Sequence, residues 1–341
     1  MKRGTIIWGA VGLVVLAILG GLGFVWSEET AFHDRASQLR AEGEPLTFED
    51  FVEPVRDEDN AAVVFDELGA TVSPEALVEL DADSARALAA TWDERIDAAL
   101  ARPYYRPHSF IKNTHHLVAI VLSVRKDPAD VVRLLTWGHK HEGGLLLAPR
   151  QVRYLLAFSV IRFHARAKTL PDPVARRCVE LLDDVAEVHV PSKWIRAQRN
   201  LLADRILQWE RGEVRLLHGL PPFVPQRVLI YRDVNGVLEL LDDALRWCDP
   251  PTAEAERKAI RLHPGDTYDT FAGPHYAASI PTYALRTSLD GIRETRMIRR
   301  LLLHTLGETT PLPTDPRTEQ PVTQAEWDKW LASGAEPDEE E

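Results

Sequence analysis

An uninterrupted apolar run near the N-terminus constrains this chain more than any other feature. From Thr5 to Trp26 there are 22 residues and no charged side chain. A helix that rises about 1.5 Å per residue would be about 33 Å long over this stretch. The hydrocarbon core of a bilayer is roughly 30 Å thick. We therefore predict a transmembrane signal anchor over residues 5–26, with the lipid bilayer as the partner of this segment.

The charges around the apolar run predict its orientation. Lys2 and Arg3 precede it, whereas Glu28 and Glu29 follow it. Basic residues favour the cytoplasmic side of a membrane helix. We expect a single-pass protein of the cell membrane in which residues 1–4 form a cytoplasmic stub and the C-terminus is extracytoplasmic.

A cleaved secretory signal is the alternative to an anchor. Its cleavage site would need small residues, which Gly21-Leu22-Gly23 supplies. The run is longer than the usual apolar centre of roughly 7 to 15 residues in such signals. It also ends in Phe24-Val25-Trp26, and tryptophan is typical of the membrane interface. Both points favour an anchor that stays attached.

Composition excludes some classes of partner for the remaining chain. Hydrophobic residues make up 45% of the sequence, which is ordinary for a globular protein with a substantial core. The net charge is −12, and the part beyond the run is more negative still, because Lys2 and Arg3 lie before it. Such a charge argues against affinity for nucleic acid, so we expect no nucleic-acid partner.

Helical periodicity recurs after the apolar run, and alternating strand patterns are rare. We predict an all-α extracytoplasmic domain over residues 27–310, built as an irregular multi-helix bundle of antiparallel hairpins. An α-solenoid is the alternative, although no repeated residue pattern supports it. The segment over 149–170 is the most apolar of these helices, and we expect it at the centre with the next helix folded back on it. Turn and capping signals predict helices over 83–102, from 128 to about 143, and over 149–170, 174–188, 234–248 and 274–307, with further helix starts at 73–76 and 191–192.

The last residues read as a separate region, 311–341. Four prolines between 311 and 321 are typical of a linker. Thr323 is a suitable N-cap for a short helix that carries Trp327 and Trp330. The chain then ends in an acidic tail.

Two cysteines, Cys178 and Cys248, do not make a disulfide scaffold. Each lies on an apolar helical stripe, so we predict two buried thiols. A bridge between them would require their helices to be neighbours in space.

The histidine pairs do not have the spacing of a helical metal site. His139 and His141 are two residues apart, and His115 and His116 are adjacent. Ligands on one helix are expected at i and i+4, because residues closer together point in different directions. We therefore predict no metal site at these histidines and no cofactor.

Known catalytic motifs are also missing from the sequence. There is no Gly-x-Ser-x-Gly elbow, Walker loop, Gly-x-Gly-x-x-Gly or haem-attachment motif. One stripe of charge remains as a candidate binding surface. It consists of four arginines that follow one another at intervals of seven, three and four residues, which places their guanidinium groups on one helical face. There they would receive an acidic partner or ligand. Pairing with carboxylates of the chain itself is the alternative. The stripe consists of Arg286, Arg293, Arg296 and Arg300.

A short segment after the anchor resembles a known pattern. It runs from Glu53 through Pro54-Val55-Arg56-Asp57-Glu58-Asp59-Asn60 to Ala61-Ala62, followed by Val63-Val64-Phe65. This segment is similar to a juxtamembrane pattern found in a loose group of uncharacterised bacterial proteins that have a single N-terminal anchor and a helical outer region. The resemblance implies the same topology and carries no activity. It does not cover the last thirty or so residues.

These observations favour a membrane-tethered interaction or scaffold module that binds an envelope protein or polymer. The alternative is an envelope hydrolase with a nonstandard site between helices. A His gathered with a carboxylate between helices would favour the hydrolase.

Overall fold

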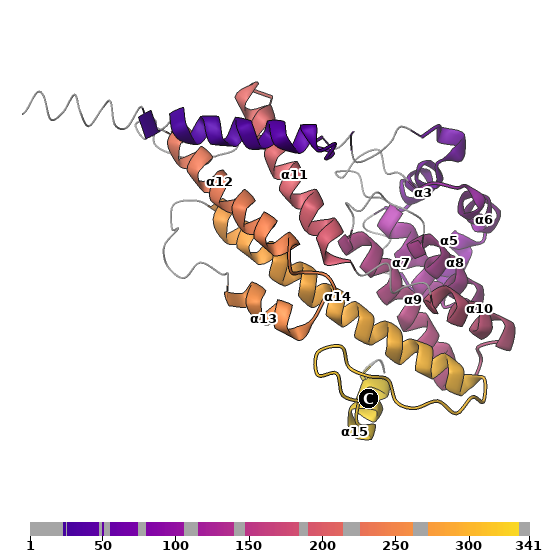
Figure 1. The fold of residues 1–341 in the computed structure, drawn as a ribbon. Helices are drawn as coiled ribbons and strands as arrows, with labels where there is room; N and C mark the ends of the chain where they lie inside the picture. The colour runs from indigo at the N-terminus through magenta and orange to yellow at the C-terminus, as the bar shows by residue number, and fades with distance from the viewer. Residues whose placement is uncertain are drawn as a thin grey trace, which may run out of the picture. The chain divides into compact units, whose positions relative to one another are not determined.

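A computed structural model shows that the described part of the chain is all-α (Figure 1). It describes residues 23–24, 26–47, 50, 55–73, 80–105, 115–139, 147–183, 190–213, 226–261 and 272–333. No strand occurs within these ranges, and extended backbone pairs there only at two isolated bridges. The predicted all-α class is confirmed for this part of the chain.

Helices of very different length make up the fold. The first covers residues 26–41 and carries no label in Figure 1. The labelled elements are the 3-10 helix η1 (Asp57–Asp59), α3 (Ala61–Gly69), α5 (Ala82–Ala89), α6 (Asp93–Ala101), α7 (His115–Arg125), α8 (Pro128–His139), α9 (Leu147–Ala167), α10 (Asp172–Asp183), α11 (Pro191–Glu210), α12 (Gln226–Leu245), α13 (Ala253–Arg261), α14 (Ala272–Thr305) and α15 (Gln324–Ala332).

The predicted anchor over 5–26 lies outside the described residues, apart from Gly23, Phe24 and Trp26. Among the helices that the structure does describe, none has the length and apolar character needed to cross a membrane. Phe24 and Trp26 have exposed side chains, 45% and 75% respectively. The transmembrane segment therefore stays a prediction.

The chain divides into two compact units, each assembled from separate stretches of sequence. Unit 1 consists of Met1–Phe51, Ile195–Cys248 and Arg257–Tyr283. Unit 2 consists of Val52–Trp194, Asp249–Glu256 and Ala284–Glu341. The helices α11, α13 and α14 each contribute residues to both units.

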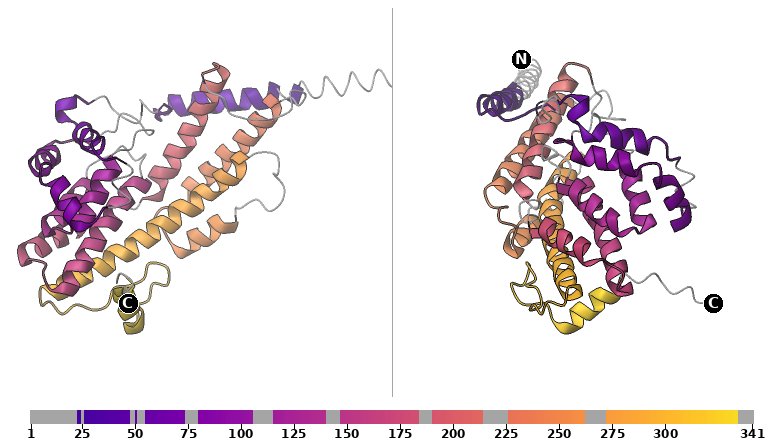
Figure 2. Two further views of the ribbon diagram at one scale, coloured as in Figure 1. Left: turned by 180° about the vertical axis from the view of Figure 1, so that it is seen from behind. Right: turned by 90° about the vertical axis from the view of Figure 1, so that its right-hand side faces the viewer.

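Unit 2 has one shared apolar core. Helix α9 packs against α8 and α7, and α7 also contacts α3 and α5 (Figure 2). The contact between α3 and α7 skips α5 and α6 and suits a bundle, because a solenoid repeat contacts only the repeats next to it. At the centre, the rings of Phe65 and Trp137 are stacked with centroids 3.7 Å apart. The predicted central position of the 149–170 helix agrees with these contacts.

Two predictions for unit 2 are wrong. The helix predicted over 83–102 is two helices, α5 and α6, because the chain turns at residues 90–92. The turn buries Trp92, and the Thr91 hydroxyl bonds to the backbone oxygen of Leu88. Helix α10 packs chiefly on α8 among the described residues, whereas α9 was predicted as its main partner. Its apolar stripe reaches the shared core through Ala175, Cys178 and Leu182.

Residues 306–333 fold onto unit 2. Val322 and Trp327 are buried in its core. The loop that joins α14 to this segment is closed by backbone hydrogen bonds. In one of them the Val322 N–H donates to the Pro313 oxygen at 2.8 Å. Thr323 caps α15 in a capping box with Glu326, as its sequence position predicts. The proline-rich stretch is thus an ordered loop in the structure.

Unit 1 encloses a smaller core in which the helix of residues 26–41 crosses α11 and α12 (Figures 1 and 2). Phe32, Leu39 and Leu46 from the N-terminal stretch contact the apolar faces of those two helices. The contacts include Ile206 of α11 and Tyr231 of α12. The chain that follows the predicted anchor is therefore part of a folded core.

Both cysteines are buried, and no disulfide joins them. Burial raises the pKa of the Cys178 thiol to about 12. The prediction of buried thiols is confirmed.

Candidate functional site

The arginine stripe of α14 faces other parts of unit 2. Arg293 pairs with Asp315 at 2.8 Å, and Arg296 donates to the Thr314 backbone oxygen at 2.8 Å. Arg286 lies 3.5 Å from a carboxylate oxygen of Glu256, and its side chain is 60% exposed. These contacts with the chain itself are the predicted alternative to an external acidic partner.

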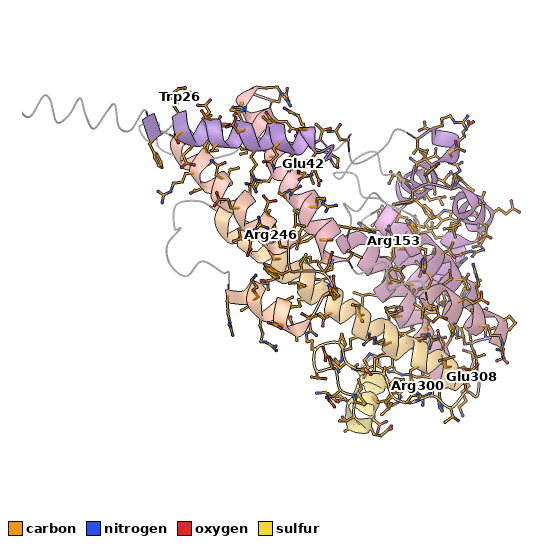
Figure 3. The ribbon with its side chains drawn as sticks, in the orientation of Figure 1. Trp26, Glu42, Arg153, Arg246, Arg300 and Glu308 are labelled. Atoms are coloured by element: carbon orange, nitrogen blue, oxygen red, sulfur yellow. The ribbon has the colours of Figure 1, made fainter. Side chains whose placement is uncertain are left out.

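Arg300 ends the stripe next to the C-terminal helix (Figure 3). Its guanidinium carbon lies 5.9 Å from the centre of the Trp327 ring. The ring of Trp330 is stacked on Trp327 and faces Arg162 of α9 at 4.4 Å. The Trp330 indole also donates to Glu294 at 2.9 Å. Arg300 therefore lies against α15, which Arg162 and Glu294 also contact through Trp330.

The histidines singled out from the sequence do not form a site among the described residues. His139 lies at the end of α8 with its ring 6.1 Å from that of Tyr154. His141 lies outside the described part of the chain, and so does the side chain of His115. His116 is half-buried in α7. The structure gathers a different histidine with carboxylates.

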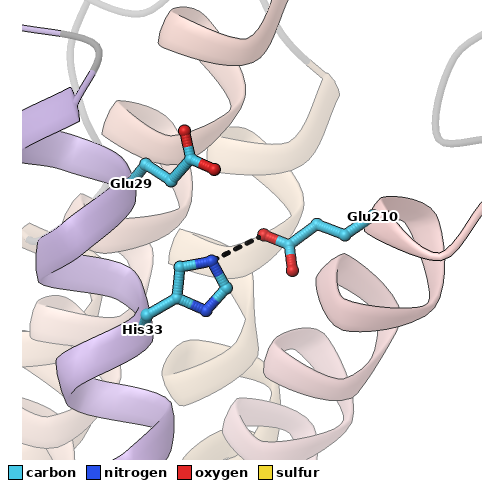
Figure 4. Close-up of side chains that lie close together, drawn as sticks. All are labelled: Glu29, His33 and Glu210. Atoms are coloured by element: carbon cyan, nitrogen blue, oxygen red, sulfur yellow. Dashed lines mark ion pairs between the residues drawn. The ribbon is translucent and has the colours of Figure 1, made fainter.

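That histidine is His33, in unit 1. Its Nε2 atom lies 3.2 Å from a carboxylate oxygen of Glu210, at the end of α11 (Figure 4). Glu29 lies on the same helix as His33, and Figure 4 shows both side chains directed towards Glu210. One ligand atom from each of the three side chains lies within 4.8 Å of the others. We call Glu29, His33 and Glu210 the His33 cluster.

Local structure holds the His33 cluster together. Glu29 and His33 are four residues apart on one helix, so their side chains lie on the same face. Phe32 packs beside His33 in the core of unit 1, with ring centroids 5.5 Å apart. The hydroxyl of Tyr231, a fully buried residue of α12, donates to the Glu210 carboxylate. Three helices therefore contribute to the site.

The cluster contains the donors of a transition-metal site, one imidazole and two carboxylates. All three residues are partly exposed, with 45% of the His33 side chain and 15% of the Glu210 side chain accessible. The same arrangement also places a histidine beside a carboxylate, which is the pairing used for general-base catalysis. Either chemistry would be reached from solvent.

Part of this site was readable in the sequence. The i and i+4 rule that excluded the other histidines is satisfied by Glu29 and His33 once a carboxylate is accepted as one member. Glu210 carries no such signal, because it lies far along the chain and approaches only through the packing of α11. We predicted no metal site, and His33 was not selected.

A second unusual group is the buried Arg153 of α9, in unit 2. Its guanidinium carbon lies 5.1 Å from the Tyr105 ring and 5.0 Å from the Trp137 ring. Burial lowers the pKa of Arg153 and raises the pKa of Tyr105. Because both residues are fully buried, this cluster is part of the core and not an accessible site.

Comparison with known proteins identifies no relative of this chain. No protein-family model matches it, and neither the curated proteins nor the solved structures contain a match.

Proposed function

We propose that this protein is a membrane-tethered, extracytoplasmic helical module that binds a protein or polymer of the cell envelope. The apolar run over 5–26 and the charges on either side of it support the tether. One structural observation carries the proposal further. The helix that follows the run, residues 26–41, is part of the unit 1 core through Phe32 and Leu39.

Polar contacts also fasten this helix to unit 1. Asn235 of α12 donates to the Glu28 backbone oxygen at 2.9 Å, and Arg35 pairs with Asp242. Just beyond the helix, Asn200 of α11 donates to the Pro45 backbone oxygen at 2.9 Å. A tether that enters unit 1 through this helix would hold unit 1 close to the membrane.

Cell fractionation tests the tether. We expect the full chain in the membrane fraction, resistant to washing with high salt, and cleaved only by protease added from the extracytoplasmic side. A variant that lacks residues 5–22 should be released from the membrane. The tether is excluded if the intact chain is found in the soluble cytoplasmic fraction with its N-terminus open to protease there.

For the binding surface, we propose the exposed part of the arginine stripe. Arg286 and Arg296 have exposed side chains, whereas Arg293 and Arg300 are partly buried against the C-terminal segment. Two guanidinium groups on one helical face suit a partner that carries carboxylate or phosphate groups.

Site-specific crosslinking in intact cells tests this surface. A photoreactive residue at Asp290, one turn from Arg286 and 58% exposed, should capture a defined partner. The double change Arg286→Glu and Arg296→Glu should abolish the adduct. The matched control, Arg177→Glu on the exposed face of α10, should leave it unchanged. An adduct that survives the double change, or no adduct at all, would contradict binding at this stripe.

The His33 cluster favours a second candidate, an envelope hydrolase. A histidine 3.2 Å from a carboxylate is suited to accept a proton from water or a hydroxyl group. The full chain should then hydrolyse a member of an ester, phosphoester and peptide panel. The activity should fall at least about a hundredfold in His33→Ala, the loss typical of a general base. Equal rates for wild type and variant would exclude the hydrolase.

A further inference from the structure

We propose that Glu29, His33 and Glu210 bind one divalent transition-metal ion of the zinc class, which fastens the helix of residues 26–41 to the end of α11. The inference does not depend on membrane attachment, on partner binding or on hydrolysis. It depends only on the atoms that the three side chains bring together.

The donor set selects the class of metal. One imidazole nitrogen and two carboxylate oxygens are ligands that Zn²⁺ binds at about 2.0 to 2.2 Å. Ca²⁺ and Mg²⁺ prefer oxygen ligands alone, and Ca²⁺ takes six to eight of them. A dication also balances the charges of two carboxylates. A metal ion that accepts both nitrogen and oxygen ligands, as Zn²⁺ does, therefore fits this site better than Ca²⁺ or Mg²⁺.

The spacing is close to that of a bound site. Two ligands of a tetrahedral Zn²⁺ ion lie about 3.3 Å apart when each bond is about 2.0 to 2.1 Å long. The His33 Nε2 atom is already 3.2 Å from the Glu210 oxygen. The Glu29 ligand atom lies within 4.8 Å of both, so a small approach of this carboxylate would complete the set.

The surroundings orient the Glu210 ligand before an ion arrives. Tyr231 donates its hydroxyl to Glu210 and thereby fixes the carboxylate orientation. Outer hydrogen bonds of this kind orient metal ligands and raise affinity. The neighbouring cation Arg211 is turned to Glu213, at 2.7 Å, and does not compete for Glu210 in this arrangement. Three protein ligands would leave a coordination position for water, as in many zinc sites.

The ion would connect two parts of the chain that lie far apart in sequence. Glu29 and His33 follow the predicted anchor directly, whereas Glu210 ends a helix in the second stretch of unit 1. An ion that binds only the folded arrangement stabilises that arrangement. Bound zinc would therefore stabilise unit 1.

Calorimetry on the metal-free full chain, prepared without a polyhistidine tag, tests the site. We expect one Zn²⁺ per chain and a higher thermal unfolding temperature with zinc, and no comparable response to Mg²⁺ or Ca²⁺. His33→Ala, Glu29→Gln and Glu210→Gln should each weaken zinc binding by more than the roughly 10- to 100-fold that loss of an outer hydrogen bond causes. Tyr231→Phe should weaken it by about tenfold, as expected for a positioning residue.

Two controls keep the result specific. His304→Ala removes an exposed histidine of α14, outside the His33 cluster, and should leave zinc affinity unchanged. X-ray absorption of the zinc-loaded chain should show nitrogen and oxygen ligands and no sulfur. Unchanged affinity in a folded His33→Ala variant, or a sulfur-ligated spectrum, would overturn the proposal. Loss of zinc binding in His304→Ala would overturn it as well.

Discussion

Buried charges in unit 2 are held by specific partners. Arg125 and Asp130 are almost completely buried and form a pair through two hydrogen bonds, one of them 2.6 Å long. Burial raises the pKa of Asp130 despite its two arginine neighbours, Arg125 and Arg133. Asp93 also bonds to both arginines, and these bonds outweigh its own burial and lower its pKa. The network is satisfied only while each member is present.

Asp130→Asn should therefore destabilise the protein. It leaves Arg125 buried with a weaker set of acceptors, and breaking such a pair costs about 3 to 5 kcal/mol. Because Asp93 still pairs with Arg125, we expect the lower end of that range. Asp83→Asn is the matched control, since it breaks an exposed pair with Arg86 and should change stability by less than about 1 kcal/mol. Urea unfolding of both variants measures the difference, and equal values would contradict a role for the buried pair.

Arg153 provides a second test at the scale of single residues. Its guanidinium faces the rings of Tyr105 and Trp137 and is planar and weakly hydrated, whereas a lysine ammonium group is compact and strongly hydrated and is costlier to bury there. We expect Arg153→Lys to lower the free energy of unfolding by about 1 to 3 kcal/mol. Arg153→Met removes the buried charge and keeps most of the volume, so it should be better tolerated. A lysine variant as stable as wild type would show that the ring contacts contribute little.

At the scale of helices, signals close to the helix ends were the reliable part of the sequence. Asp127-Pro128 and Pro191-Ser192 begin helices where predicted, and Thr323 caps α15. These signals are local, because a cap bonds to backbone groups within the same turn. The break at Trp92 was missed because it depends on burial of one side chain in a distant core. The packing of α10 on α8 was missed because it also depends on tertiary contacts that no local pattern records.

The capping box of α15 predicts a response to acid. Backbone and hydroxyl groups of Thr323 donate to Glu326, and these bonds lower the pKa of the carboxyl group. A lowered pKa means that the folded state favours the charged form. Its stabilising effect is thus present above the ordinary value of 4.5 and is lost as the pH falls through the folded pKa.

Hydrogen exchange of the peptide 323–333 checks this expectation. Its protection, corrected for intrinsic rates, should fall on the acid side of pH 4.5 in the wild type. Glu326→Gln should show lower protection at neutral pH and little further loss of protection on acidification. If both proteins respond to acid alike, the capping carboxylate is not the group responsible.

At the scale of the whole chain, the sequence predicted the all-α fold class but not the division into two compact units. Composition and periodicity were sufficient for an all-α fold, which follows from hydrophobic spacing along each helix. The two units draw on three stretches each, and such long-range choices leave no local pattern. The His33 cluster was likewise only partly predictable from the sequence. Glu29 and His33 share a readable spacing, whereas Glu210 joins them only through the fold.

Unit 1 should lose stability when its N-terminal helix no longer packs. Phe32→Ala with Leu39→Ala removes two buried side chains from its core, at a cost of several kcal/mol. Hydrogen exchange of the full chain should then show lost protection in α11 and α12, with α8 and α9 in unit 2 less affected. Ser37→Ala, at an exposed position on the same helix, should leave both units protected. Loss of protection spread evenly over both units would contradict the partition.

The discontinuous make-up of the two units has a consequence for biogenesis. Residues 26–41 leave the ribosome long before α11 and α12, against which they pack. The core of unit 2 is complete only after Val322 and Trp327, late in the sequence, have been synthesised. Neither unit can close while the middle of the chain is still being made. During synthesis the early helices would carry exposed apolar faces, so this protein is expected to depend on holding chaperones until nearly all of it has emerged.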